Sequence, residues 1–123
     1  MRRASPARMR SLLAAVVLLV SAAPAFAASY AAAQAAAHIG ETATIEGPVS
    51  GTHVDARSGA GFIDMGGRYP NQTFTGFIPR GALGRFGDLS RYEGKSLGIT
   101  GTVRDYRGRP EIILSDPGQV HAQ

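Results

Sequence analysis

The sequence predicts a small all-β domain, a five-stranded Greek-key barrel. Three observations lead to this prediction. Apolar and polar residues alternate over most of the chain after residue 41, Gly and Pro divide that part into short segments, and only one of its segments has helical spacing. The chain has 123 residues and no Cys. We therefore expect one domain held together by a single small core, without disulfides.

The amino-terminal segment, residues 1–27, has the layout of a secretory signal peptide. Four arginines within the first ten residues precede an apolar run from Leu12 to Val20, and a stretch of small residues then ends at Ala27. The apolar run is much shorter than the roughly 20 residues that a membrane-spanning helix needs. We expect cleavage after Ala27, no stable membrane span, and one mature domain, residues 28–123, in the periplasm or secreted.

Cleavage changes the charge of the protein. Four of the 13 basic residues lie in the signal segment, which leaves nine Lys and Arg against nine Asp and Glu. The mature chain is therefore formally neutral and lacks the long-range attraction for polyanions that a strongly basic protein has. Any affinity for nucleic acid is expected to be modest.

The mature chain is predicted to begin with a short helix and a bent strand. Ala28 to Ala37 is rich in Ala, which favours a helix, and Gly40 fits the position that follows a helix end. A period of two begins at Glu41 and predicts strand one. Pro48 to Gly51 marks a bend, after which the strand resumes through Val54.

Strands two and three are predicted over Phe62 to Met65 and Thr73 to Ile78. Their alternation divides the side chains between two faces. The residues expected to face the core are Ile63, Met65, Phe74 and Ile78. Those expected to face outward include Phe62, Thr75 and Phe77.

A segment without alternation, Pro79 to Tyr92, is predicted to form one or two helical turns or an ordered loop. Leu97 to Val103 then shows the clearest period of two in the chain and predicts strand four. A tight turn over Tyr106 to Arg109 leads into strand five, Pro110 to Leu114, with Ile112 and Leu114 inward. The polar tail from Ser115 is expected to be frayed.

Three strands, a short helix or loop, and a final hairpin follow the element order of the OB-fold. Small barrels also need glycines at corners and close strand crossings, because a Cβ there would collide with a neighbour. The glycines in such places are Gly47, Gly51, Gly94, Gly98 and Gly101.

Four segments carry a resemblance to a known group of proteins. They are residues 38–42 (HIGET), 69–74 (YPNQTF), 92–95 (YEGK) and 107–120, which begins RGRPEI and ends DPGQV. With these segments the chain, from Ala33 to Val120, resembles small exported bacterial OB-fold domains related to nucleic-acid-binding OB modules. The resemblance implies a barrel of the nucleic-acid-binding type.

OB-folds bind ligands on the outer face of strands two and three and on the neighbouring loops. Single-stranded nucleic acid is held there by aromatic stacking and a basic groove. The aromatic residues expected in such places are Phe62, Tyr69, Phe77 and Tyr106. The basic ones are Arg57, Arg68, Arg104, Arg107 and Arg109. The predicted ligand is single-stranded nucleic acid or another polyanion.

Two other interpretations stay open. In one, the arginine-rich turns are solvated surface, and Phe62 and Phe77 pack against the amino-terminal helix or the barrel ends. In the other, the domain is a periplasmic protein-interaction or envelope-stress module that recognises an envelope protein partner and has no nucleic-acid role. The sequence indicates no oligomeric state.

Catalysis, metal binding and cofactors are not expected. Some secreted nucleases are OB barrels with a calcium site of clustered carboxylates, but a carboxylate metal loop needs closely spaced acids. The aspartates here are dispersed: Asp55, Asp64, Asp88 and Asp105. The histidines lack metal-ligand spacing: His38, His53 and His121. No phosphate loop or serine nucleophile motif occurs.

Overall fold

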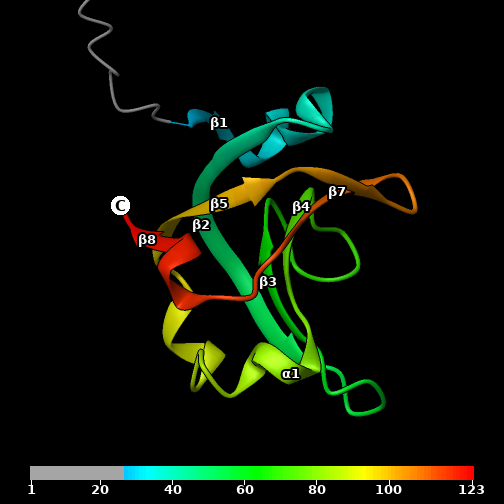
Figure 1. Cartoon of the computed structure of the whole chain (residues 1–123), viewed down its shortest axis with the longest axis vertical. Coiled ribbons are helices and arrows are strands. Elements are labelled where there is room, and N and C mark those ends of the chain that lie inside the picture. The colour runs from blue at the N-terminus through cyan, green and yellow to red at the C-terminus, as the bar shows by residue number, and fades with distance from the viewer. Residues whose placement is uncertain (1–26) are drawn as a thin grey trace, which may run out of the picture.

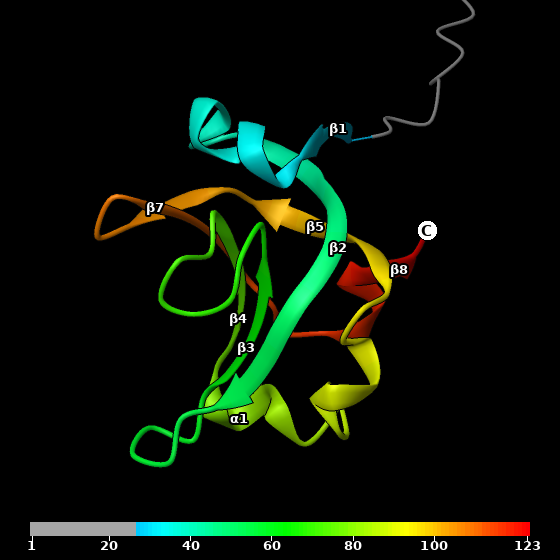
Figure 2. The same ribbon diagram turned by 180° about the vertical axis from the view of Figure 1, so that it is seen from behind.

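The structure, a computed structural model, describes residues 27–123. Its longest strand, β2 (Thr42–Val54), curves through the whole domain (Figures 1 and 2). The first half of β2 pairs antiparallel with β5 (Ser96–Thr102) and the second half with β3 (Gly61–Met65). The register with β3 shifts between Val49 and Gly51, so the predicted bend in strand one is confirmed.

The remaining strands extend one mixed sheet. β4 (Phe74–Ile78) is antiparallel to β3, β7 (Arg109–Ile113) is parallel to β4, and β6 (Arg104–Tyr106) is antiparallel to β7. Only Val103 separates β5 from β6, and together they occupy the place predicted for strand four. The domain is thus β-rich and OB-like, with a few short helices. Within residues 27–123 the sheet has eight strands rather than the predicted five.

The predicted helical segment between strands three and four is present as short turns. α1 (Arg80–Leu83) and the 3-10 turn η2 (Leu89–Tyr92) lie at one end of the domain, as Figure 1 shows. Phe86 and Leu89 are buried there, because this segment covers the end of the core.

The predicted amino-terminal helix is wrong for its first four residues. Ala28–Ala31 form strand β1, which pairs parallel with residues 43–46 of β2, and the 3-10 turn η1 follows over Ala32–His38. A lone helix of this length is marginal in water. Pairing with the edge of β2 satisfies backbone groups that the helix would leave to solvent, and this outweighs the helix propensity of Ala.

The predicted fraying of the tail is also wrong. The 3-10 turn η3 (Pro117–Gln119) leads into β8 (Val120–Ala122), which pairs antiparallel with β5. Local hydrogen bonds hold this turn: Asp116 Oδ1 accepts from the Gly118 amide at 2.7 Å, and Gln119 Oε1 accepts from the Ser115 amide at 2.9 Å. The tail is ordered because side chains cap the turn.

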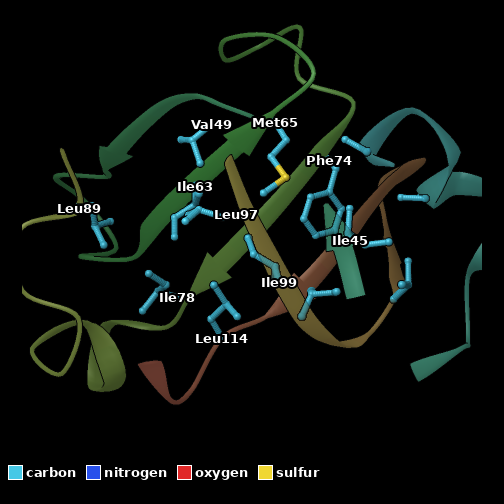
Figure 3. Close-up of a cluster of buried hydrophobic side chains, with 14 of the residues drawn as sticks. Ile45, Val49, Ile63, Met65, Phe74, Ile78, Leu89, Leu97, Ile99 and Leu114 are labelled. Carbon is cyan, nitrogen blue, oxygen red and sulfur yellow. The ribbon is translucent and has the colours of Figure 1, made fainter. Parts of the chain in front are cut away.

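The core is a cluster of buried apolar side chains from β2, β3, β4, β5 and β7, many of which Figure 3 shows. The side chains predicted to face it are confirmed as completely buried, each with 0% exposure: Ile63, Met65, Phe74, Ile78, Ile112 and Leu114. This packing fixes which residues of β3, β4 and β7 are left to face outward.

The predicted signal peptide lies outside the described residues, apart from Ala27. Within residues 27–123, no helix is long and apolar enough to cross a membrane.

Candidate ligand-binding groove

Four residues form a row across the outer side of the sheet. His53 of β2 is opposite Phe62 of β3, Phe62 is opposite Phe77 of β4, and Phe77 is opposite Ile113 of β7. Residues directly opposite on neighbouring strands project from the same side. We call His53, Phe62, Phe77 and Ile113 the aromatic row.

The rings of this row contact one another. The imidazole of His53 stacks on Phe62 with ring centroids 4.4 Å apart, and Phe77 meets Phe62 edge-on at 5.5 Å. Tyr69 lies tilted beside His53, with centroids 5.2 Å apart. Phe62 and Phe77 are partly exposed. The prediction that they point away from the core is therefore confirmed.

A second row, parallel to the first, is polar. Asp64 of β3 is opposite Thr75 of β4, Thr75 is opposite Glu111 of β7, and Glu111 is opposite Arg104 of β6. Thr75 Oγ1 donates to Asp64 Oδ1 at 3.1 Å, and Arg104 Nε donates to Glu111 Oε1 at 3.1 Å. We call Asp64, Thr75, Glu111 and Arg104 the polar row.

Two carboxyl groups of the polar row are buried. Asp64 is 1% exposed and Glu111 is 4% exposed. Burial raises the pKa of each, because a carboxylate loses hydration there. His53, with Nδ1 3.3 Å from Asp64 Oδ2, partly offsets the rise in the pKa of Asp64, and Arg104 does the same for the pKa of Glu111.

Above the two rows lie two adjoining hollows, of about 220 and 440 Å³. Five residues line both: Phe62, Tyr69, Tyr106, Arg107 and Glu111. The smaller hollow also contacts Thr75 and Arg109, and the larger one contacts His53, Asp55, Phe77 and Arg104. We refer to the pair of hollows as the outer groove.

The β6–β7 hairpin forms one wall of the outer groove. Its two-residue turn places Arg107 at φ 51° and Gly108 at φ 84°, the left-handed conformations of a type I′ turn, so the predicted tight turn is confirmed. Tyr106 is 47% exposed, and the Arg107 guanidinium lies 5.3 Å from its ring. The hairpin thus presents an aromatic ring and a cation together.

The β3–β4 loop forms another part of the lining, and its Tyr69 is 67% exposed. Arg109 of the hairpin donates to the carbonyl oxygen of Pro70 and, at 3.1 Å, to Gln72 Oε1. These bonds tie the loop to the hairpin. The loop and the hairpin project from the same side of the domain in Figures 1 and 2.

Seven of the nine residues predicted from the sequence line the outer groove: Phe62, Tyr69, Phe77, Arg104, Tyr106, Arg107 and Arg109. Arg68 lies beyond Tyr69 and lines a neighbouring hollow. Arg57 is exposed in the β2–β3 loop and lines neither half of the groove. The role of all nine residues in nucleic-acid binding stays a prediction.

The groove arginines differ in how they are engaged. Arg104 pairs with Glu111 at 2.9 Å, and Arg109 is hydrogen-bonded to the loop. Within residues 27–123, Arg107 has no carboxylate within 4.0 Å. It is therefore the groove arginine best placed to meet an anionic ligand.

His53 and Glu111 are among the groove residues that sequence reasoning missed. His53 had no ligand spacing, and Glu111 was not singled out. The strand period gave a signal for Glu111, since it alternates with the inward-facing Ile112. Across residues 27–123, no group of three or more His, Cys, Asp or Glu side chains is placed to hold a metal ion.

Comparison with known proteins concerns the fold alone. No family model and no curated protein sequence matches this chain. A crystal structure of a protein assigned as an aspartyl-tRNA synthetase, from Leishmania major Friedlin, is similar with a TM-score of 0.50 and 12% sequence identity. The match covers 83% of this chain and 22% of that protein, so this chain spans about a fifth of its length.

Proposed function

We propose that this domain binds single-stranded nucleic acid, or another anionic oligomer, in the outer groove. The observation that carries the proposal is the aromatic row, whose His53, Phe62 and Phe77 line the same hollow as Arg107 and the exposed rings of Tyr69 and Tyr106. Bases stack on such rings whatever their sequence, and arginines beside the rings meet the phosphates.

The five-stranded OB barrel is part of this proposal. β5 pairs with β2, β6 pairs with β7, and one residue separates β5 from β6. Treated as one bent strand, β5 and β6 close the sheet between its two ends. The outer groove then lies on the outer face of strands two and three and beside the neighbouring loops, which is where OB-folds bind ligands.

The structural comparison supports the proposal only coarsely. The similar protein is assigned as a synthetase that acts with a transfer RNA, as its name states. At 12% identity this likeness links the fold, and not particular residues, to nucleic acids.

The affinity should be modest. Each stacked base contributes roughly 1–3 kcal/mol, and ordering the ligand and the side chains offsets part of this. Two or three stacked bases contribute about 2–9 kcal/mol, so a Kd on the order of 1 µM, about 8 kcal/mol, is near the tightest that stacking supports. The formally neutral mature chain adds little long-range attraction.

We also propose that the protein is exported and acts by binding, without catalysis. β1 begins at Ala28, the residue that would follow the expected cleavage. Mass spectrometry of the exported protein checks this: a chain that starts at Ala28 supports the proposal, and an exported chain that retains residues 1–27 contradicts it.

A titration followed by NMR tests where the ligand binds. Adding a single-stranded oligonucleotide should shift the amide signals of Phe62, Phe77 and Tyr106, while signals of α1 and η2 stay in place. Shifts confined to α1, η2 or η1 would contradict binding in the outer groove.

A protein ligand in the same groove is the second candidate. Exposed Tyr and Arg side chains are enriched at protein interfaces, and the groove presents Tyr69, Tyr106 and Arg107. Recovery of one envelope protein by cross-linking at Tyr106, together with no oligonucleotide binding, would favour this candidate.

A further inference from the structure

Glu111 presents an oxygen to the outer groove that its partner does not use. Both contacts from Arg104 fall on Oε1, at 3.1 Å from Nε and 2.9 Å from Nη2. Oε2 accepts no hydrogen bond from residues 27–123. In this part of the chain every fully buried side-chain oxygen has a hydrogen-bond partner, so the unpartnered Oε2 must be accessible to solvent. Because Glu111 lines both hollows, Oε2 is open to the groove.

The other acidic group of the polar row is already engaged. Oδ1 of Asp64 accepts from Thr75, and Oδ2 lies 3.3 Å from His53 Nδ1. Glu111 Oε2 is therefore the carboxylate oxygen of this row that a ligand can reach.

The charges fix how a strand would lie. Glu111 lines both hollows and its carboxylate repels phosphate, whereas the exposed Arg107, which also lines both, attracts it. The sugar–phosphate chain then lies beside Arg107, and the bases point toward Glu111 and the rings of the aromatic row.

We propose that Glu111 Oε2 accepts a hydrogen bond from the exocyclic amino group of a bound base. This inference rests on the proposed function and adds a specificity to it. Cytosine, adenine and guanine carry such a group, and a carboxylate is a known acceptor for the amino group of cytosine. Uracil and thymine present a carbonyl oxygen at the corresponding position, which a carboxylate repels.

Two homopolymers make the sharpest comparison, labelled oligo-dC and oligo-dU of equal length. Cytosine and uracil have rings of the same size and differ at the amino or carbonyl group on C4 and at N3, so stacking and backbone charge are matched. A good base contact discriminates by about 5-fold or more. We expect the wild-type protein to bind oligo-dC at least 5-fold more tightly than oligo-dU at neutral pH.

A substitution assigns this preference to the carboxylate. In Glu111→Gln, an amide that both donates and accepts replaces Oε1 and Oε2, so the ratio of the two affinities should fall below twofold. Glu46→Gln removes the same charge outside the groove and should keep the wild-type ratio. Far-UV circular dichroism establishes that each variant is folded.

The outcomes separate the two proposals. Equal binding of oligo-dC and oligo-dU by the wild-type protein overturns the inference about Glu111 and leaves the proposed function standing, whether or not the variant folds. A preference for oligo-dC that survives in folded Glu111→Gln also overturns it. Binding of neither homopolymer at low salt overturns the proposed function and, with it, this inference.

Discussion

The imidazole of His53 stacks on the ring of Phe62, with centroids 4.4 Å apart and planes 5° apart. The same imidazole reaches the buried Asp64 through Nδ1, at 3.3 Å. His53 therefore joins the aromatic row to the polar row and covers one face of the Phe62 ring. A ligand base meets a surface whose rings are already ordered, which lowers the entropic cost of binding.

Phe62 should be the aromatic side chain on which binding depends most, since its ring contacts those of His53 and Phe77 and it lines both hollows. Replacing Phe62 by Ala removes one stacking surface, so we expect a loss of roughly 1–3 kcal/mol, a Kd about 5- to 150-fold weaker. Fluorescence anisotropy with a labelled oligonucleotide measures the change.

Phe62→Leu is the matched control, because it keeps an apolar side chain without a π face. We expect its affinity to be as weak as that of Phe62→Ala, while its thermal stability stays closer to wild type. Full affinity in Phe62→Leu would show that stacking is not the source of binding.

The hairpin arginines should set the salt dependence of binding. For single strands, the slope of log K against log salt changes by about 0.7 for each phosphate contact. The triple variant Arg104→Ala, Arg107→Ala and Arg109→Ala should flatten the slope by up to about 2.

A triple variant with the same loss of charge elsewhere controls for net charge: Arg80→Ala, Arg85→Ala and Lys95→Ala. These residues are exposed and line neither hollow. We expect it to keep most of the wild-type slope. Equal slopes in the two triple variants would exclude the hairpin from the binding site.

The buried carboxyl of Glu111 should make stability fall as pH rises. Its pKa is raised by burial above the ordinary value of 4.5, so ionisation favours the unfolded chain between 4.5 and the raised pKa. Gln does not ionise, so the Glu111→Gln variant does not lose stability in this way. The unfolding free energy of Glu111→Gln minus that of wild type should therefore increase with pH across this interval and level off above it.

Asp88 offers a control of opposite sign. Hydrogen bonds from Ser90 hold the pKa of Asp88 below its ordinary 3.8, so its ionised form favours the folded state. The unfolding free energy of Asp88→Asn minus that of wild type should therefore decrease as pH rises toward 3.8. Urea unfolding at a series of pH values measures both, and a flat difference for Glu111→Gln would contradict the burial argument.

Gly101 should not tolerate a side chain. A Cβ at this position would lie 2.6 Å from Ile112 Cγ2, in the packed core, so Gly101→Ala should lower stability by about 1–3 kcal/mol. Gly81, in α1, has open space around it, and Gly81→Ala should be neutral or slightly stabilising. Thermal unfolding compares the two, and an unchanged Tm in Gly101→Ala would contradict the packing.

Much of the groove follows from the strand period. Alternation in β3 and β4 places Phe62 and Phe77 on one side because Ile63 and Ile78 must be buried on the other. The prediction that five glycines occupy crowded positions is confirmed for only some of them. Gly98 and Gly101 are crowded as predicted, whereas a Cβ on Gly47 or Gly51 would meet only ordinary contacts, beyond 3.6 Å, and Gly94 needs its positive φ instead.

The rest depends on pairings between distant parts of the chain. Glu111 meets Arg104 only because β6 and β7 pair in one register, and His53 stacks on Phe62 only because β2 shifts its register after Val49. β1 and β8 add to the sheet through backbone bonds that leave no period in Ala-rich or polar segments. Such contacts between distant segments cannot be predicted from the local sequence pattern.

Fluorescence anisotropy of the purified protein with a labelled single-stranded oligonucleotide, at two salt concentrations, tests the central claim most directly. We predict saturable binding on the order of 1 µM at low salt that weakens at high salt. The absence of binding even at low salt would contradict a nucleic-acid ligand and leave the outer groove to a protein partner.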